Sequence, residues 1–144
     1  MKIYLASSWE NKYQPHIVGL LRCYGHEVYD FRNPNDKDDG FSWSDIDPNW
    51  EKWSFDNFKN ALNHPIAVNG FNKDFDAMKW ADCCVLLLPS GRSAHTEAGF
   101  MKGAGKKVIV CIPQFEISEL MYKIYDEIVS NPIDLIHSLN KLKI

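Results

Sequence analysis

The chain has 144 residues, which is long enough for one folded domain with a substantial core. Its formal net charge of −3 argues against a polyanion such as DNA as a partner, although a small anion can still bind at a local site. No apolar run approaches the ~20 residues of a membrane span, and the apolar start is too short for a signal peptide. We therefore expect a cytoplasmic protein that binds neither nucleic acid polymers nor membranes.

The four cysteines show no metal-ligand spacing such as CxxC. Cys83 and Cys84 are adjacent in a predicted buried strand, and Cys111 lies in another. We interpret them as buried, reduced thiols, which fits a cytoplasmic protein, and we predict no metal site.

The chain begins with a predicted strand at Lys2–Ala6, which Ser7, Ser8 and Trp9 follow directly, and we predict that these three residues contact a substrate. A serine at this place has two interpretations: it caps the next helix, or it accompanies exposed N–H groups that suit an anion. The helix is predicted over 11–24, with Gly25 as its stop, and a second strand follows over 27–31.

Residues 33–48 are turn-rich and acidic, and their spacing does not fit a calcium-binding EF-hand loop. The amphipathic stretch 49–62 predicts a helix. Trp43, Trp50 and Trp53 surround this region, either as a lid that stacks on a planar ligand or as a small satellite core. We predict a single domain over 1–144 in which 33–63 is an inserted, tryptophan-rich loop and helix.

Asn69-Gly70 predicts a turn, and residues 72–80 predict a further helix, which carries Asp74 and Asp76. Asp82 opens the strand after it. Each aspartate has a plain interpretation as a solvated or capping carboxylate. Asp74, near the start of its helix, can instead face the sheet edge that carries the candidate site.

The segment 81–113 organises the chain as strand, glycine turn, helix, glycine stop and strand. Cys83–Leu88 and Val108–Ile112 are apolar runs typical of strands buried on both faces, and 93–102 is helical in composition. This is a βαβ unit, so its strands should be parallel with a right-handed crossover. Ligands of such sheets bind beyond the carboxyl ends of the strands, where the polar segment 89–97 lies.

Glu97 lies about one turn into this helix, beside the small residues Ala94, Ala98 and Gly99. A substrate can therefore approach it closely. The alternative is that Glu97 only complements the helix dipole.

The last part of the chain predicts a helix over 114–130 and another over 132–142. We count four strands and a short fifth near the C-terminal region. The predicted fold is α/β: a flavodoxin-like or Rossmann-like, doubly wound parallel sheet of four to five strands with helices on both faces.

Three segments together resemble the nucleoside 2-deoxyribosyltransferase family and its relatives that hydrolyse nucleotide N-glycosidic bonds. They are KIYLAS at the start, NKDFDAMKWADCCVLLLP in the middle, and SGRSAHTEAGFMKGAGKKVIV after it. Each short motif is weak alone, and their order and spacing make the resemblance specific. The matching positions are Tyr4, Asp74, Ala81-Asp82, Gly91, Glu97, Gly99 and Gly105-Lys106.

The resemblance implies three catalytic residues. Glu97 would attack the anomeric carbon of a (deoxy)ribosyl group and form a covalent glycosyl-enzyme. Asp74 would help deliver a proton to the departing base, and Tyr4 would hold Glu97 by a hydrogen bond. Water or a second base would resolve the intermediate, so no cofactor is implied.

The chain departs from the family pattern six residues before Glu97, where typical transferases carry an acid near the sugar hydroxyl. Gly91 stands there, followed by Arg92 and Ser93. Relatives that act on 5'-monophosphates use a hydroxyl and backbone N–H groups around this turn. Arg92, Ser93 and the helix N-terminus form either a phosphate cradle or an exposed arginine and a capping serine.

Family members also complete their sites across a subunit contact, with an Asn-x-Met segment after the last core strand. Glu119-Leu120-Met121 lies near that place, with glutamate for asparagine. The resemblance therefore implies a homo-oligomer in which Met121 contacts substrate. His95 has no implied role, and two residues before Glu97 on a helix it should point elsewhere.

The leading hypothesis is an enzyme that cleaves or transfers the N-glycosidic bond of a nucleoside or nucleoside 5'-monophosphate. One alternative is a 5'-monophosphate N-glycoside hydrolase without transfer, and another is a non-catalytic nucleotide-binding module. The joint presence of Glu97, Asp74 and Tyr4 argues against the module. A flavodoxin-like signalling or redox protein is disfavoured, because the first strand lacks a phosphorylatable aspartate at its end and no flavin phosphate loop is evident.

Overall fold

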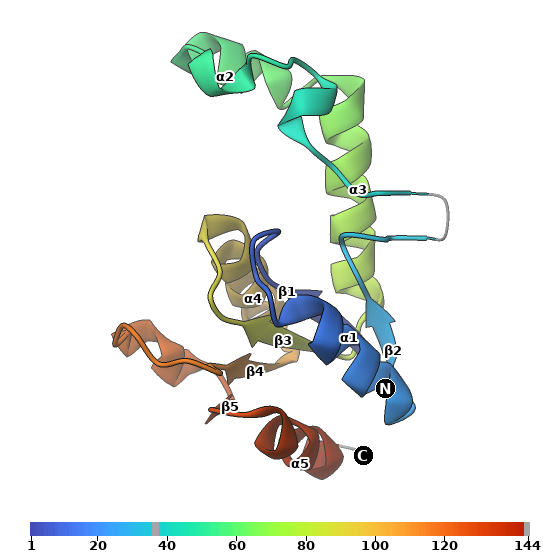
Figure 1. Cartoon of the computed structure of the whole chain (residues 1–144), viewed down its shortest axis with the longest axis vertical. Coiled ribbons are helices and arrows are strands. Elements are labelled where there is room, and N and C mark those ends of the chain that lie inside the picture. The colour runs from blue at the N-terminus through green and yellow to red at the C-terminus, as the bar shows by residue number, and fades with distance from the viewer. Residues whose placement is uncertain (36–37, 143–144) are drawn as a thin grey trace. The chain divides into compact units, whose positions relative to one another are not determined.

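The computed structural model describes residues 1–35 and 38–142, which form two compact units (Figure 1). The first, here called the sheet unit, comprises Met1–Asp30 and Trp80–Ile144, and the second, the helical unit, comprises Phe31–Lys79. Residues 36 and 37 of the predicted insertion lie outside the described residues. The assignment of 1–144 to a single domain stays a prediction.

The sheet unit contains five parallel strands in the order β2-β1-β3-β4-β5. The strands are β1 (Lys2–Ala6), β2 (Glu27–Tyr29), β3 (Cys83–Leu87), β4 (Lys107–Cys111) and β5 (Glu127–Val129). This order is the flavodoxin-like doubly wound topology, in which the chain direction across the sheet reverses between β1 and β3. The predicted parallel sheet and its short fifth strand are confirmed.

Helices cover both faces of this sheet, as predicted. On one face α1 (Gln14–Cys23) and α5 (Pro132–Leu142) bury apolar side chains against alternate residues of β1, β3 and β4. On the other face α4 (Arg92–Gly103) contacts the same three strands and buries Ala94, Ala98 and Met101. The central strand β3 is buried at every position, which explains its continuous apolar sequence.

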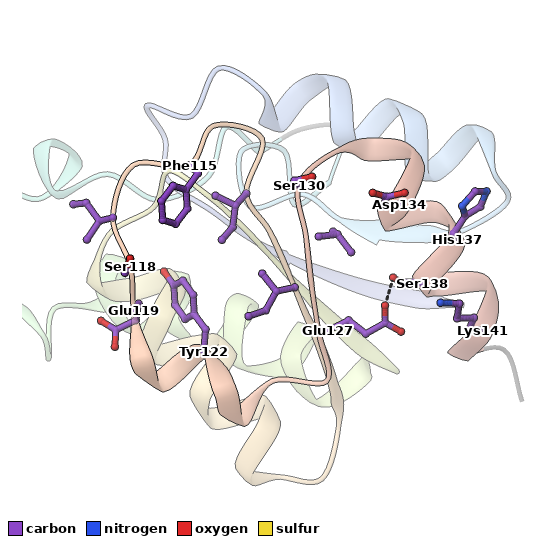
Figure 2. Close-up of a pocket in the computed structure, with 14 residues that line it drawn as sticks. Phe115, Ser118, Glu119, Tyr122, Glu127, Ser130, Asp134, His137, Ser138 and Lys141 are labelled. Carbon is purple, nitrogen blue, oxygen red and sulfur yellow. Dashed lines mark hydrogen bonds between the residues drawn. The ribbon is translucent and has the colours of Figure 1, made fainter.

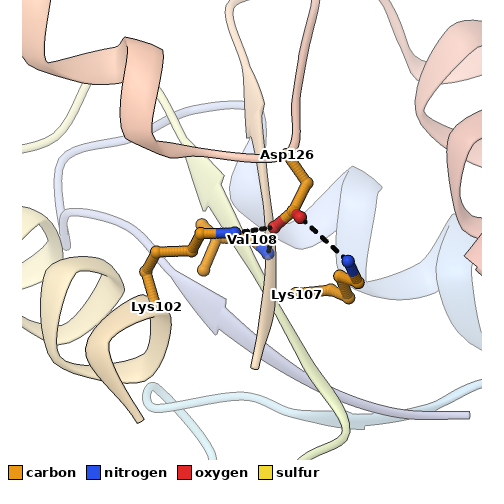
Figure 3. Close-up of polar contacts among 4 residues, drawn as sticks. All are labelled: Lys102, Lys107, Val108 and Asp126. Atoms are coloured by element: carbon orange, nitrogen blue, oxygen red, sulfur yellow. Dashed lines mark hydrogen bonds and ion pairs between the residues drawn. The ribbon is translucent and has the colours of Figure 1, made fainter. Parts of the chain in front are cut away.

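Asp126 links the end of α4 to the start of β4 at one edge of the sheet (Figure 3). Its carboxylate accepts hydrogen bonds from Lys102 Nζ at the end of α4 (2.9 Å), Lys107 Nζ (3.2 Å) and the Val108 N–H of β4 (2.8 Å). Burial acts to raise the pKa of Asp126, but these donors outweigh it and hold that pKa below its ordinary value.

The helical unit contains two 3-10 turns, Trp43–Asp45 and Trp50–Lys52, followed by α2 (Phe55–Ala61) and α3 (Pro65–Trp80), whose last residue belongs to the sheet unit. The predicted helix 49–62 is thus divided, because Ser54 and Asn57 form a capping box that starts α2.

Trp43 lies in a small aromatic core of the helical unit. The rings of Phe41, Trp53 and Phe58 meet the Trp43 ring edge-on or steeply inclined, at centroid distances of 4.8, 5.7 and 6.2 Å respectively. Trp53 Nε1 also donates to Asp47 at 2.8 Å. These contacts correspond to the satellite core, one of the two interpretations of the tryptophan cluster, while Trp50 is 36% exposed.

The turn predicted at Asn69-Gly70 is wrong, because both residues lie inside α3. The predicted helix 72–80 is the second half of α3, which begins at Pro65, where proline is favoured. Glycine at position 70 lets the Phe41 side chain pack directly against α3, because a Cβ at this position would lie 3.0 Å from that side chain.

The helix predicted over 114–130 is also wrong. The structure has an irregular segment after β4, a 3-10 helix η3 (Leu120–Ile124), and then β5. The apolar spacing imitates a helix, but Ile117, Leu120 and Ile128 are exposed rather than on one buried face. Pairing of β5 with β4 satisfies the backbone instead and buries Val129 in the core.

Candidate active site

A buried tyrosine and a glutamate meet on the α4 side of the sheet. The hydroxyl group of Tyr4, on β1, donates a hydrogen bond to the carboxylate of Glu97, the sixth residue of α4. Tyr4 is only 1% exposed, and the Tyr29 ring stacks on it at a centroid distance of 5.4 Å and an interplanar angle of 15°. A rigid phenol therefore orients a partly exposed carboxylate.

The local sequence explains how α4 comes so close to the sheet. Ala94 and Ala98 are buried, and their small side chains allow the helix backbone to approach the strands. Cys84 on β3 pairs in register with Tyr4, so it lies below the helix as well. Burial, followed by the charges of Cys83 and Glu97, raises the pKa of Cys84 well above its ordinary value. Cys84 is therefore a neutral thiol, which leaves Glu97 as the nucleophile candidate here.

The loops at the carboxyl ends of β1 and β3 are joined by side-chain hydrogen bonds. Ser7 Oγ donates to the Leu87 carbonyl at 2.9 Å. Asn11 Nδ2 donates to the same carbonyl at 3.2 Å and to the Pro89 carbonyl at 3.1 Å. Asn11 is 1% exposed, whereas its place in the sequence predicts only the first residue of a helix, which gives no sign of these contacts. These hydrogen bonds hold the two loops together at the carboxyl ends of the strands, where proteins of this topology bind their ligands.

The interpretation of Ser7 or Ser8 as a helix cap is wrong, because α1 begins only at Gln14. Ser8 Oγ instead accepts a hydrogen bond from the Glu10 N–H at 3.2 Å, in a turn of the loop. Trp9, in the same loop, is 50% exposed. A role of these residues in substrate binding stays a prediction.

The glycine turn leads directly into α4. Gly91 is its N-cap residue and provides no side-chain cap, while Arg92 and Ser93 are the first two helical residues, both exposed. Ser93 is therefore not the N-cap of α4. The first N–H groups of α4 have no partner within the helix, which suits an anion.

Ser90 precedes this turn, and nothing in the sequence around it predicts a functional role. Its hydroxyl is sealed from solvent and has no hydrogen-bond partner within residues 1–35 and 38–142. A buried hydroxyl of this kind can donate to a ligand that enters the turn.

Asp74 and Met121 lie on other elements. Asp74 is a half-buried residue of α3 in the helical unit, and its predicted place at the sheet edge that carries Glu97 stays a prediction. Met121 lies in η3 of the sheet unit and is 60% exposed. The Glu119 carboxylate accepts a hydrogen bond from the Met121 N–H at 3.0 Å and so caps η3.

A cavity of about 720 Å³ lies beside β5, but none of the predicted site residues lines it (Figure 2). Its walls are the segment after β4, with Phe115 and Tyr122, and the polar side of α5, with His137 and Lys141. The Ser138 hydroxyl donates to Glu127 at its floor. The cavity is therefore separate from the Tyr4–Glu97 pair.

Among the residues that the structure describes, no three His, Cys, Asp or Glu side chains gather as a metal ion would require. No described helix is long and apolar enough to cross a membrane.

The topology and the position of Glu97 define an α/β protein of the flavodoxin-like class with a polar site at its sheet edge. Several solved structures are similar to it, among them two enzymes. The 2-deoxyribosyltransferase of Bacillus psychrosaccharolyticus has a TM-score of 0.67 and 24% identity, over 94% of this chain and 90% of that one. The CMP N-glycosidase of Clostridium botulinum has a TM-score of 0.51 and 17% identity, over 97% of this chain and 99% of that one. These likenesses confirm the predicted fold.

Comparisons with protein-family models and with curated proteins give no match.

Proposed function

We propose that this chain is an enzyme that cleaves the N-glycosidic bond of a nucleoside or nucleoside 5'-monophosphate, and re-forms it when a second base is present. The observation that carries the proposal is the hydrogen bond from buried Tyr4 to the Glu97 carboxylate, beside the switch point of the sheet. The fold shared with a 2-deoxyribosyltransferase and a CMP N-glycosidase supports it.

In the first step a Glu97 carboxylate oxygen attacks the anomeric carbon, and the bond from that carbon to the base nitrogen breaks. The electron pair of this bond leaves with the base, which takes a proton from the carboxyl group of Asp74. The product is a glycosyl ester of Glu97. The Tyr4 hydroxyl binds one oxygen of the Glu97 carboxylate and so orients it, and the other carboxylate oxygen attacks the carbon.

In the second step water or another base attacks the same carbon, and the ester bond to Glu97 breaks. Asp74, now a carboxylate, accepts the proton of the attacking group. Two displacements at one carbon retain its configuration. Transfer and hydrolysis thus share one intermediate and differ only in which acceptor reaches it.

The turn before α4 favours 5'-monophosphates over free nucleosides. Gly91 carries no acid to bind a sugar hydroxyl, and the first N–H groups of α4 suit a phosphate. The exposed Arg92 and Ser93 begin α4, and the Ser90 hydroxyl just before Gly91 has no hydrogen-bond partner among the described residues, so these side chains add donors beside the first N–H groups. Ser7, Ser8 and Trp9 belong to the adjacent loop and are proposed to contact the substrate.

We further propose a cytoplasmic homo-oligomer in which Met121 contacts the substrate of a neighbouring subunit. The segment around Met121 supports this, because Phe115, Ile117 and Leu120 are 69%, 79% and 81% exposed. Large apolar side chains exposed together favour a protein contact.

The proposal is tested by a substrate panel. Nucleosides, deoxynucleosides and their 5'-monophosphates are each incubated with the protein, with and without a second free base, and the products are separated by chromatography. Base release confined to monophosphates identifies a nucleotide hydrolase, and a new glycoside formed only with the second base identifies a transferase. Tight binding of a nucleotide without turnover would contradict the proposal in favour of a binding module.

A further inference from the structure

His95 joins the turn before α4 to the segment after β4. Its Nδ1 lies 2.8 Å from the Gly91 carbonyl oxygen, and its Nε2 lies 2.7 Å from the Tyr122 hydroxyl of η3. The two rings also stack, with centroids 5.7 Å apart and an interplanar angle of 19°. The ring thus contacts Gly91 and Tyr122, as expected for a residue that points away from Glu97.

The chemistry of the partners sets the direction of both hydrogen bonds. A carbonyl oxygen can only accept, so Nδ1 carries the proton and donates to Gly91. In the neutral ring Nε2 is then an acceptor, and the Tyr122 hydroxyl donates to it. Burial, with the charges of Glu119 and Tyr125, raises the pKa of Tyr122, which keeps its hydroxyl protonated as this role requires.

His95 and Glu97 hold α4 on opposite flanks. Successive residues of an α-helix are about 100° apart, so these two side chains point about 160° away from each other. Around the helix axis, Ala94 and Ala98 lie in the arc between these two side chains, and both are buried against the sheet. Glu97 therefore bonds Tyr4 on the β1 side, and His95 bonds Tyr122 on the side of η3, which follows β4. A rotation of α4 about its axis would break one contact or the other.

We propose that His95 is a positioning residue, which with Tyr122 fixes the rotation of α4 and so aims the Glu97 carboxylate at the reacting carbon. The same two hydrogen bonds of His95 also fix the position of the Gly91 turn relative to η3, which carries Met121. This inference rests on the proposed function, in which Glu97 attacks the anomeric carbon of the substrate. Small errors in the aim of a reacting group lower the chemical rate more than they lower substrate affinity.

The test uses variants that remove one hydrogen bond and little else. Tyr122→Phe keeps the stacked ring without its hydroxyl. His95→Asn retains an amide donor for the Gly91 carbonyl and lacks the acceptor at Nε2. Tyr125→Phe is the matched control, because its ring lies 6.0 Å from Tyr122 and the same atom is removed. We measure kcat, KM and Tm for the three variants and for the Tyr122→Phe/His95→Asn double variant.

We expect Tyr122→Phe and His95→Asn each to lower kcat by about tenfold, with KM changed by less than about twofold. The double variant should be no slower than the slower single variant, because both changes break the same contact. Tyr125→Phe should match the wild type. A kcat of Tyr122→Phe within about twofold of the wild type, or losses that multiply in the double variant, would overturn the proposal.

A second measurement separates this inference from the proposed function. Nitrogen-15 spectra of the imidazole rings should show His95 protonated at Nδ1, with an Nε2 resonance that shifts in Tyr122→Phe. A ring protonated at Nε2, or an Nε2 resonance that does not move, would overturn the link even in an active enzyme. A wild-type protein that turns over no substrate would contradict the proposed function, while the spectra still decide the link.

Discussion

The Tyr4 hydroxyl donates to the Glu97 carboxylate across 93 residues of sequence. Parallel pairing of β1 with β3 and the crossover of α4 over the same strands bring the two residues together. The Tyr29 ring stacks on the buried Tyr4 ring and so restrains the phenol. The carboxylate that we propose as nucleophile is thus oriented by the sheet itself.

Tyr4→Phe removes this hydrogen bond and keeps the buried ring. We expect kcat/KM to fall by about ten- to a hundredfold, which corresponds to the loss of one hydrogen bond to a charged group. Initial rates on the best substrate of the panel measure the loss. Tyr24→Phe is the control, because Tyr24 is 56% exposed at the end of α1. Equal rates for Tyr4→Phe and Tyr24→Phe would show that the hydrogen bond has no catalytic role.

Asn11→Asp replaces the amide that donates to the Leu87 and Pro89 carbonyls with a carboxylate that can only accept. Both hydrogen bonds are lost at a buried site, so the free energy of unfolding should fall by about 2–4 kcal/mol. Urea denaturation followed by circular dichroism measures it. Asn69→Asp, the same change at an exposed position, should shift it by less than about 0.5 kcal/mol. Similar stabilities for the two variants would contradict the role of Asn11.

The cysteines should differ sharply in reactivity. Burial raises the pKa of Cys83 to about 12 and that of Cys111 to about 11, and Cys84 is raised too, whereas Cys23 is exposed. Because the thiolate is the reactive form, the native protein at pH 8 should label at Cys23 alone, and the unfolded protein at all four cysteines. Peptide mapping by mass spectrometry identifies the labelled sites. Fast labelling of Cys84 in the native protein would mean that α4 does not cover β3 stably.

Asp126 should contribute stability that depends on pH. Its pKa is held below the ordinary value, so its contribution is present above about pH 4 and is lost as the pH falls through the folded-state pKa. Asp126→Asn should therefore lower the free energy of unfolding by about 1–3 kcal/mol at pH 7 and by less at pH 3. Denaturation curves at both pH values test this, with exposed Asp76→Asn as control. A stability difference between the wild type and Asp126→Asn that is larger at pH 3 than at pH 7 would contradict this role of the Asp126 carboxylate.

The sequence predicted the central βαβ unit well because its signals are local. The apolar runs of β3 and β4 and the glycines that bound α4 each indicate one structure without knowledge of the rest of the chain. The segment 114–130 lacked such a signal. Its apolar spacing fits a helix, and only pairing with β4 decides that 127–129 form a strand.

The Tyr4–Glu97 hydrogen bond was predicted because motifs mark both residues, whereas contacts that depend on packing were missed. Tyr4 and Glu97 stand at positions that a family resemblance singles out. Asn11 and Tyr122 matter through hydrogen bonds to partners far along the chain, and neither has a distinctive neighbourhood in the sequence. The pair Asn69-Gly70 predicts a turn, but glycine is frequent both in turns and at sites of close packing. Only the packing of Gly70 against the Phe41 ring distinguishes the two.

The most direct test of the central claim compares the wild type with Glu97→Gln on the substrate that the panel identifies. Glutamine keeps the size of the side chain and can still accept from Tyr4, so the fold should survive with an unchanged Tm. The account predicts that base release falls by at least about a thousandfold, because the amide cannot form the glycosyl ester. A Glu97→Gln variant that releases base at a rate within about twofold of the wild type would contradict it.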